Sequence, residues 1–178
     1  DSGQLTSLDA VNVTISDAEL TDISATSLLS IGGATTGVVT VTNAIAISGT
    51  ADHVTAALLT EDTLVVVSDA TVSISDTGSI AAVVLTDIAG VTSGVVTSAN
   101  VTMITGTASE IQAALDSGQL TSLDAVNVTI SDAGAVAATV LTNLTASTTG
   151  DITSTVVTSI TGTAAEVQAA LDDVDLIS

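Results

Sequence analysis

The sequence of 178 residues contains no Lys, Arg, Pro, Cys, Phe, Tyr or Trp. Without aromatic residues, any core has to be built from Ala, Val, Ile and Leu, and apolar residues make up 46% of the chain. Without Cys there are no disulfides. Without Arg, Tyr and Trp, the chain lacks the residue types that dominate compact protein-binding patches. The abundant Val and Ile favour strands, so we expect a fold of many small, stacked side chains.

The missing basic residues leave 20 acidic residues unopposed, for a formal net charge of −20. Nucleic acids and anionic membrane surfaces are therefore not expected partners, because both need cations on the protein. The apolar stretches are short and broken by Thr, Ser and Asp, so we expect no membrane insertion. A chain this acidic repels itself unless salt or bound cations offset the charge, which indicates a saline or calcium-rich setting.

An internal repeat of about 57 residues organises the whole chain. The first 18 residues, DSGQLTSLDAVNVTISDA, recur letter for letter at positions 116–133. An I-S-D triplet and a G-T-A triplet recur in every copy, which gives this division: repeat unit 1 (1–58), repeat unit 2 (59–115), repeat unit 3 (116–171) and the start of a truncated fourth unit (172–178). The chain is therefore expected to be a fragment of a larger repeat protein, with any targeting signal outside it.

The residues before each I-S-D triplet alternate between apolar and polar. Val126, Val128 and Ile130 fall on one side of an extended chain, which predicts a strand. In the middle copy, Val72 and Ile74 follow the same pattern.

The residues after each G-T-A triplet carry helix-start signals. Thr163 and Glu166 have the spacing of a capping box, and Thr107 and Glu110 repeat it. In the first copy His53 replaces the Glu, so no box is expected there. A second helical or turn-like segment is predicted at 133–144 and 77–88, followed by a Gly and a short β-like piece at 151–156.

One such unit has too little apolar surface to fold alone, whereas stacked copies share a continuous core. The pattern predicts a repeat solenoid: a parallel β-solenoid with short helical segments on one side and leucine-rich-repeat-like stacking. An all-β solenoid without helices is the alternative. Both predict an elongated rod.

Two segments, TGTAAEVQAAL at 161–171 and VTISD at 128–132, resemble tandem repeats of giant secreted cyanobacterial proteins of the hemolysin-type or adhesin-like class. The resemblance extends through all three copies, although this chain has no aromatic residue, unlike those repeats. It implies an extracellular or cell-surface location and a structural role.

Three carboxylates end equivalent predicted strands: Asp17, Asp76 and Asp132. Stacked repeats would line them up, and with loop carbonyls they match the hard oxygen ligands that calcium prefers. No EF-hand loop or calcium-binding nonapeptide is present. The alternative is that each Asp caps the turn or helix after it. Calcium is thus the one cofactor that the sequence suggests.

His53 is the only histidine, with no Cys to help it bind a metal. It occupies a slot where the other copies carry Glu110 and Glu166, so we expect an exposed helix residue. A catalytic triad would have to be built around a residue that the other copies lack. We therefore expect no enzyme activity in this chain.

The expected function is a structural segment of a long extracellular repeat protein that forms a rod, filament, matrix or surface layer. The alternative is a calcium-stiffened adhesin stalk, or a surface repeat that binds ions or glycans. The expected partners are neighbouring repeats or further copies of the same chain.

Overall fold

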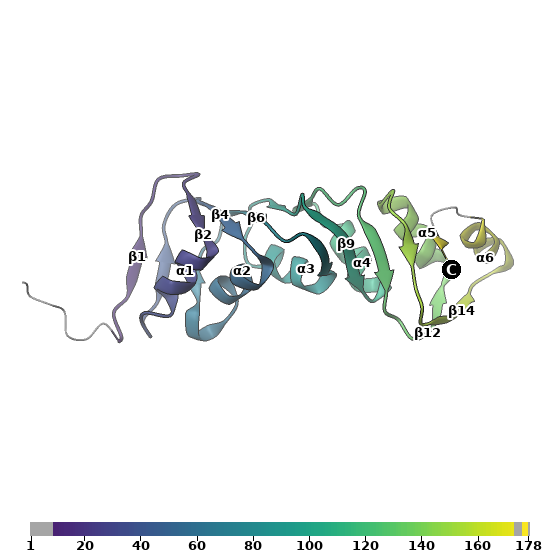
Figure 1. Cartoon of the computed structure of the whole chain (residues 1–178), viewed down its shortest axis with the longest axis horizontal. Helices are drawn as coiled ribbons and strands as arrows, with labels where there is room; N and C mark the ends of the chain where they lie inside the picture. The colour runs from purple at the N-terminus through teal and green to yellow at the C-terminus, as the bar shows by residue number, and fades with distance from the viewer. Residues whose placement is uncertain (1–8, 173–175, 178) are drawn as a thin grey trace, which may run out of the picture. The chain divides into compact units, whose positions relative to one another are not determined.

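The computed structural model describes residues 9–172 and 176–177 (Figure 1). The chain divides into two compact units, each formed by two stretches of sequence. Unit 1 comprises Asp1–Ser75 and Ile88–Val96, and unit 2 comprises Asp76–Asp87 and Thr97–Ser178.

Short strands and helices alternate along the described chain. The α-helices are α1 (Ala25–Gly32), α2 (Ala51–Leu58), α3 (Ala82–Gly90), α4 (Ala108–Leu115), α5 (Ala138–Ser147) and α6 (Ala164–Leu171), with a 3₁₀ turn η1 at Glu61–Thr63. The strands up to residue 74 are β1 (Val13–Ile15), β2 (Asp22–Ser24), β3 (Val39–Val41), β4 (Ala46–Gly49), β5 (Val65–Val66) and β6 (Thr71–Ile74). The later strands are β7 (Gly78–Ala81), β8 (Val96–Thr97), β9 (Val101–Gly106), β10 (Leu120–Thr121), β11 (Asn127–Ile130), β12 (Gly134–Ala137), β13 (Ile152–Thr153), β14 (Val157–Thr161) and β15 (Leu176–Ile177).

Unit 1 contains two sets of parallel strands. Strands β1, β3 and β5 pair in that order. Strand β4 pairs with β2 on one side and β6 on the other. Ile23, Ile47 and Val72 are aligned across this second set.

Unit 2 contains a five-stranded parallel sheet in the order β7-β9-β11-β13-β15. Ile80, Ile104, Val128 and Ile152 form one aligned and buried row across its first four strands. Neighbours in this row are 24 residues apart, and we call the stretch of chain from one strand to its in-register neighbour a layer. Strands β12 and β14 form a separate two-stranded parallel sheet.

The five-stranded sheet of unit 2 is built from more than one sequence copy. Strands β7 and β9 come from the copy at 59–115, and β11 and β13 come from the copy at 116–171. Each copy contributes two helices, so one repeat of the sequence corresponds to two layers of the fold. Because backbone hydrogen bonds cross the copy boundary, a copy is not a self-contained folding unit.

Small residues allow the layers to approach closely where the helices begin. Helices α1 to α5 each start at a buried Ala. In unit 1, a Cβ on Gly49 would lie 2.8 Å from the Cβ of Ala25, so a larger residue at either position would push the layers apart. In unit 2, helix α4 packs against β9, β11 and α5 (Figure 1). The core is therefore a stack of aliphatic side chains from strands and helices.

The predicted strands are confirmed, because β11 and β6 cover the alternating segments and bury Val128, Ile130, Val72 and Ile74. Both predicted capping boxes are confirmed at the starts of α4 and α6. The six helices contradict the alternative without helices.

The prediction for 133–144 is confirmed only for its second half, which lies in α5. The first half was expected to be helical or turn-like, but it forms β12. Strand β12 pairs with β14 and aligns Val136 with Ile160. This pairing overrides the weak local preference of a Gly-Ala-Val-Ala segment.

Candidate functional site

The candidate functional positions lie where one layer meets the next. Asp132, two residues beyond β11, accepts a hydrogen bond from the backbone N–H of Ala108 at 2.6 Å. Ala108 is the first residue of α4, where N–H groups lack helix partners and the helix dipole favours negative charge. The half-buried Asp132 carboxylate therefore binds the helix of the preceding layer, not the turn or helix that follows it.

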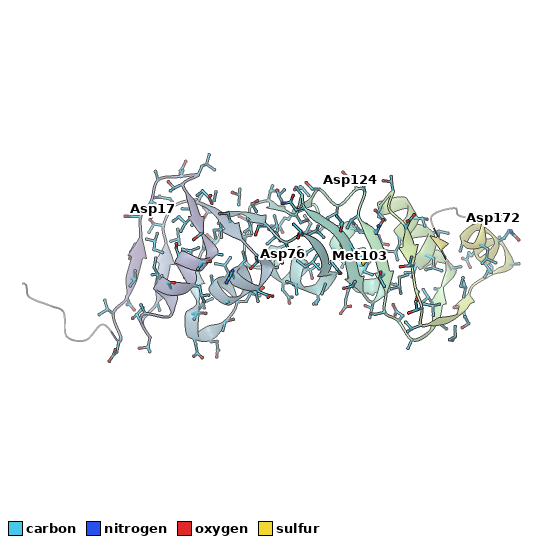
Figure 2. The ribbon with its side chains drawn as sticks, viewed as in Figure 1. Asp17, Asp76, Met103, Asp124 and Asp172 are labelled. Atoms are coloured by element: carbon cyan, nitrogen blue, oxygen red, sulfur yellow. The ribbon has the colours of Figure 1, made fainter. Side chains whose placement is uncertain are left out.

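The three Asp residues of the I-S-D triplets differ in their surroundings. Asp17 is exposed, and its backbone carbonyl accepts a hydrogen bond from the Asn43 side chain at 2.6 Å. Asp76 is half-buried, like Asp132. Figure 2 labels Asp17 after β1 and Asp76 before β7. Strands β1, β6 and β11, which these residues follow, belong to three different sheets.

A calcium site would need several of these carboxylates together. Within residues 9–172 and 176–177, no group of three or more His, Cys, Asp or Glu side chains is arranged to hold a metal ion. Calcium binding at Asp17, Asp76 and Asp132 stays a prediction.

Two further carboxylates complete the capping boxes. Glu110 accepts hydrogen bonds from the backbone N–H of Thr107 at 2.8 Å and from its hydroxyl at 2.9 Å. These bonds, the backbone one first, lower the pKa of Glu110 below its ordinary value of 4.5. The same contacts from Thr163 lower the pKa of Glu166. Both carboxylates are committed to starting a helix.

His53 lies in the same slot of the first copy, as predicted. Its ring Nδ1 is 2.9 Å from the Thr50 hydroxyl, and its backbone N–H donates to that hydroxyl at 3.4 Å. Thr50 still caps α2, but the reciprocal bond to its own backbone is absent from the described contacts of this cap. The prediction that His53 is an exposed helix residue without a capping box is confirmed.

A buried hydroxyl joins neighbouring layers in every copy. Thr148 donates to the carbonyl of Val126 at 2.7 Å and accepts from the backbone N–H of Gly150 at 3.1 Å. The equivalent Thr35 donates to the Val11 carbonyl at 2.7 Å, and Thr92 donates to the Ala70 carbonyl at 2.5 Å. Each hydroxyl satisfies two backbone groups at a turn between strands.

The Gly two residues after each of these Thr residues is required by a close approach of two backbones. A Cβ on Gly150 would lie 2.2 Å from the carbonyl oxygen of Val126, and Gly37 and Gly94 are equally tight. Sequence reasoning assigned these glycines to turns and missed the buried Thr. The signal was available, because the triplet T-[S/T]-G recurs at 35–37, 92–94 and 148–150.

A row of hydroxyls runs across the outer face of the sheet in unit 2. Thr105, Thr129 and Thr153 are aligned on β9, β11 and β13. The hydroxyls of Thr129 and Thr153 are 3.2 Å apart, and Thr153 also donates to the Val128 carbonyl at 3.1 Å. The many Thr residues thus give the sheet a polar outer face while Val and Ile fill the inner one.

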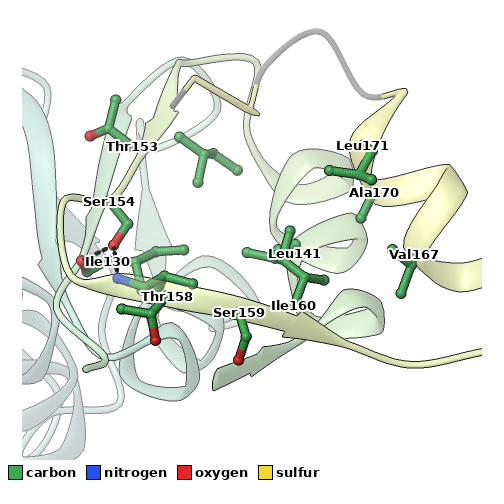
Figure 3. Close-up of a pocket in the computed structure, with 12 residues that line it drawn as sticks. Ile130, Leu141, Thr153, Ser154, Thr158, Ser159, Ile160, Val167, Ala170 and Leu171 are labelled. Carbon is green, nitrogen blue, oxygen red and sulfur yellow. Dashed lines mark hydrogen bonds between the residues drawn. The ribbon is translucent and has the colours of Figure 1, made fainter. Parts of the chain in front are cut away.

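An open apolar groove of about 620 Å³ lies at the C-terminal end of unit 2 (Figure 3). Leu141, Ile160, Val167 and Leu171 line it from α5, β14 and α6. Leu171 is 64% exposed, although the equivalent Leu58 at the end of α2 is only 3% exposed. This end therefore presents residues that other layers bury.

No protein-family model, curated protein or solved structure matches this chain. Among the described residues, no helix has both the length and the apolar character that a membrane span requires.

Proposed function

We propose that this chain is a structural segment of a long extracellular repeat protein that forms a rod, filament, matrix or surface layer. The observation that carries the proposal is the sheet β7-β9-β11-β13-β15, whose strands come from successive copies. Force applied along such a stack passes through backbone hydrogen bonds and the shared aliphatic core, with no flexible linker between copies.

The proposed architecture is a parallel β-solenoid with helices along one side. Support comes from the regular offset of 24 residues between aligned residues such as Ile104, Val128 and Ile152. Further support comes from the buried Thr hydroxyls, which make the same contact in each of the three copies.

The charge of the chain suits an exposed fibre in a saline medium. The 20 acidic residues keep a long assembly soluble, and salt limits their mutual repulsion. The likeness of 161–171 and 128–132 to repeats of giant secreted cyanobacterial proteins supports an extracellular or cell-surface location.

Small-angle X-ray scattering of this chain and of a chain with residues 59–171 duplicated tests the architecture. The duplication adds four layers, and strands in a sheet are about 4.8 Å apart, so the longest dimension should grow by about 19 Å. The cross-section should stay the same. A larger cross-section with little added length would contradict a solenoid.

The calcium-stiffened adhesin stalk is the second candidate, and the unopposed acidic charge is the observation in its favour. Thermal unfolding followed by far-ultraviolet circular dichroism, with calcium, magnesium or chelator, separates the two functions. A midpoint raised by many degrees by calcium but not by magnesium would support the stalk. A midpoint that follows ionic strength alone would support the plain structural rod.

A further inference from the structure

Two sheets of this chain match the two parts of a third. The template is the five-stranded sheet β7-β9-β11-β13-β15 of unit 2. Strands β12 and β14 occupy the repeat positions of β7 and β9, one copy later. Strands β1, β3 and β5 occupy the repeat positions of β11, β13 and β15. The sheet β12-β14 therefore corresponds to the first two strands of the template, and β1-β3-β5 corresponds to its last three.

The strand edges at which the template would be joined are both open. Strand β9 pairs with β7 on one side and β11 on the other. Among the described strands, β14 pairs only with β12, and β1 pairs only with β3. An unpaired edge of this kind is a template for adding another strand.

We infer that a second copy of this chain docks head to tail, with its β1 added in parallel to β14. The two partial sheets then complete one five-stranded sheet across the two molecules. The template sets the register: Ile104 aligns with Val128 and Thr105 with Thr129. By equivalence, Ile160 aligns with Val13 of the second copy, and Thr161 aligns with Thr14. This inference rests on the proposed function only in taking the layers as stackable.

Specific polar contacts of the template would form again at the junction. The backbone N–H of Ser131 donates to the Gly106 carbonyl at 2.8 Å, and within unit 1 Ser75 donates to Gly49 at the same distance. The equivalent pair across the junction is Ser16 and Gly162. The exposed Asp17 carboxylate takes the role of Asp132 and accepts from the N–H of Ala164, the first residue of α6.

The burial of identical residues supports this docking. Val11 and Val126 have the same place in two identical stretches of 18 residues, yet Val11 is 45% exposed and Val126 is 2% exposed. On the opposing face, Ile160 is half-buried although its equivalent Ile104 is fully buried. Docking would cover apolar surface on both faces, including the groove of Figure 3.

The two docking faces differ from each other, so the interface is heterologous and the assembly stays open-ended. Each chain has a net charge of −20, so repulsion opposes assembly at low salt. At about 0.5 M NaCl the screening length falls to only a few ångströms. Assembly should therefore strengthen with salt.

Sedimentation velocity of the whole chain at about 0.5 M NaCl, over a series of protein concentrations, tests the inference. We expect a progressive series of oligomers. Ser16→Pro removes the edge N–H and should weaken association about tenfold or more, because a strand edge without that donor cannot add a parallel neighbour. Leu171→Glu places a charge in the groove and should have a similar effect. Val83→Glu, at a residue of α3 that is 42% exposed, is the control and should associate normally.

Mixing the two impaired variants gives the sharpest outcome. The Ser16→Pro chain keeps an intact C-terminal face, and the Leu171→Glu chain keeps an intact N-terminal face. The mixture should form 1:1 dimers and nothing larger. A wild-type chain that stays monomeric at every concentration and salt level would overturn the inference, and so would a mixture in which no dimer forms.

Cysteine crosslinking tests the register, because the chain has no Cys of its own. A Thr14→Cys chain mixed with a Thr161→Cys chain should give disulfide-linked heterodimers, since directly opposed strand residues are close enough to bridge. Ser159→Cys, two residues out of register, should not crosslink to Thr14→Cys, and crosslinking there would overturn the register. Circular dichroism melts of the monomeric variants report on the fold separately, so a failure of docking is distinguishable from a failure of the layered architecture.

Discussion

Asp132 accepts a hydrogen bond from the backbone N–H of Ala108 at 2.6 Å, across the boundary between two sequence copies. A residue of one copy thus completes the helix start of the copy before it. The fold is therefore specified by pairs of neighbouring copies, and an isolated copy lacks groups that its own helices need.

Replacing Asp132 should cost stability that replacing Asp17 does not. Both residues follow the same V-T-I-S sequence, but only Asp132 binds a helix N-terminus. Asp132→Ala should lower the free energy of unfolding by about 1–2 kcal/mol. Asp17→Ala is the matched control and should leave it within about 0.5 kcal/mol in the monomer. Chemical denaturation measures both, and equal losses would contradict the capping role.

The buried Thr between layers should be sensitive to loss of its hydroxyl alone. Thr148→Val keeps the shape but leaves the Val126 carbonyl and the Gly150 N–H without this partner. We expect a loss of about 1–3 kcal/mol in the free energy of unfolding. Thr139→Val, at an exposed position of α5, is the control and should be nearly neutral. A neutral result for Thr148→Val would mean that water replaces the hydroxyl.

A methyl group at Gly150 should disrupt the turn, because it would lie 2.2 Å from the Val126 carbonyl oxygen. Gly150→Ala should cost about 3 kcal/mol or more, since backbone atoms must move. Gly118→Ala is the matched control, because nothing lies within 4 Å of its Cβ position. That control should be neutral or stabilise the chain by up to about 1 kcal/mol. Urea denaturation compares the two, and similar midpoints would refute the close approach.

The capping boxes predict a pH dependence of stability. The pKa of Glu110 is lowered in the folded chain, so its ionised form binds Thr107 preferentially in that state. Its contribution is present above the ordinary value of 4.5 and is lost as the pH falls toward the lowered value. Glu110→Gln should therefore lower the melting midpoint at pH 7, by an amount that shrinks as the solution is acidified below about pH 4.

Glu61→Gln is the control for this experiment, because it removes a charge from a 3₁₀ turn without a side-chain cap. Its effect should not follow the pattern of Glu110→Gln. A difference between wild type and Glu110→Gln that stays constant with pH would contradict a charge-dependent cap.

Local patterns in the sequence were enough to predict the repeats, the strand ending at Ile130 and the capping boxes at Thr107 and Thr163. Each of these depends on residues close together in the chain. The sequence did not predict β12, because its pairing with β14 involves residues more than 20 positions away. It also missed the contact between Asp132 and Ala108, since the helix that Asp132 binds lies 24 residues earlier in the chain.

The dependence of one copy on the next can be tested most directly on residues 59–115 alone, compared with the whole chain. In the whole chain, β9 pairs with β11 of the following copy, and α4 is capped by Asp132. Far-ultraviolet circular dichroism is the suitable probe, because the chain has no aromatic residues. We predict that the single copy shows no cooperative thermal transition while the whole chain melts cooperatively. A single copy that melts cooperatively at the midpoint of the whole chain would contradict the account.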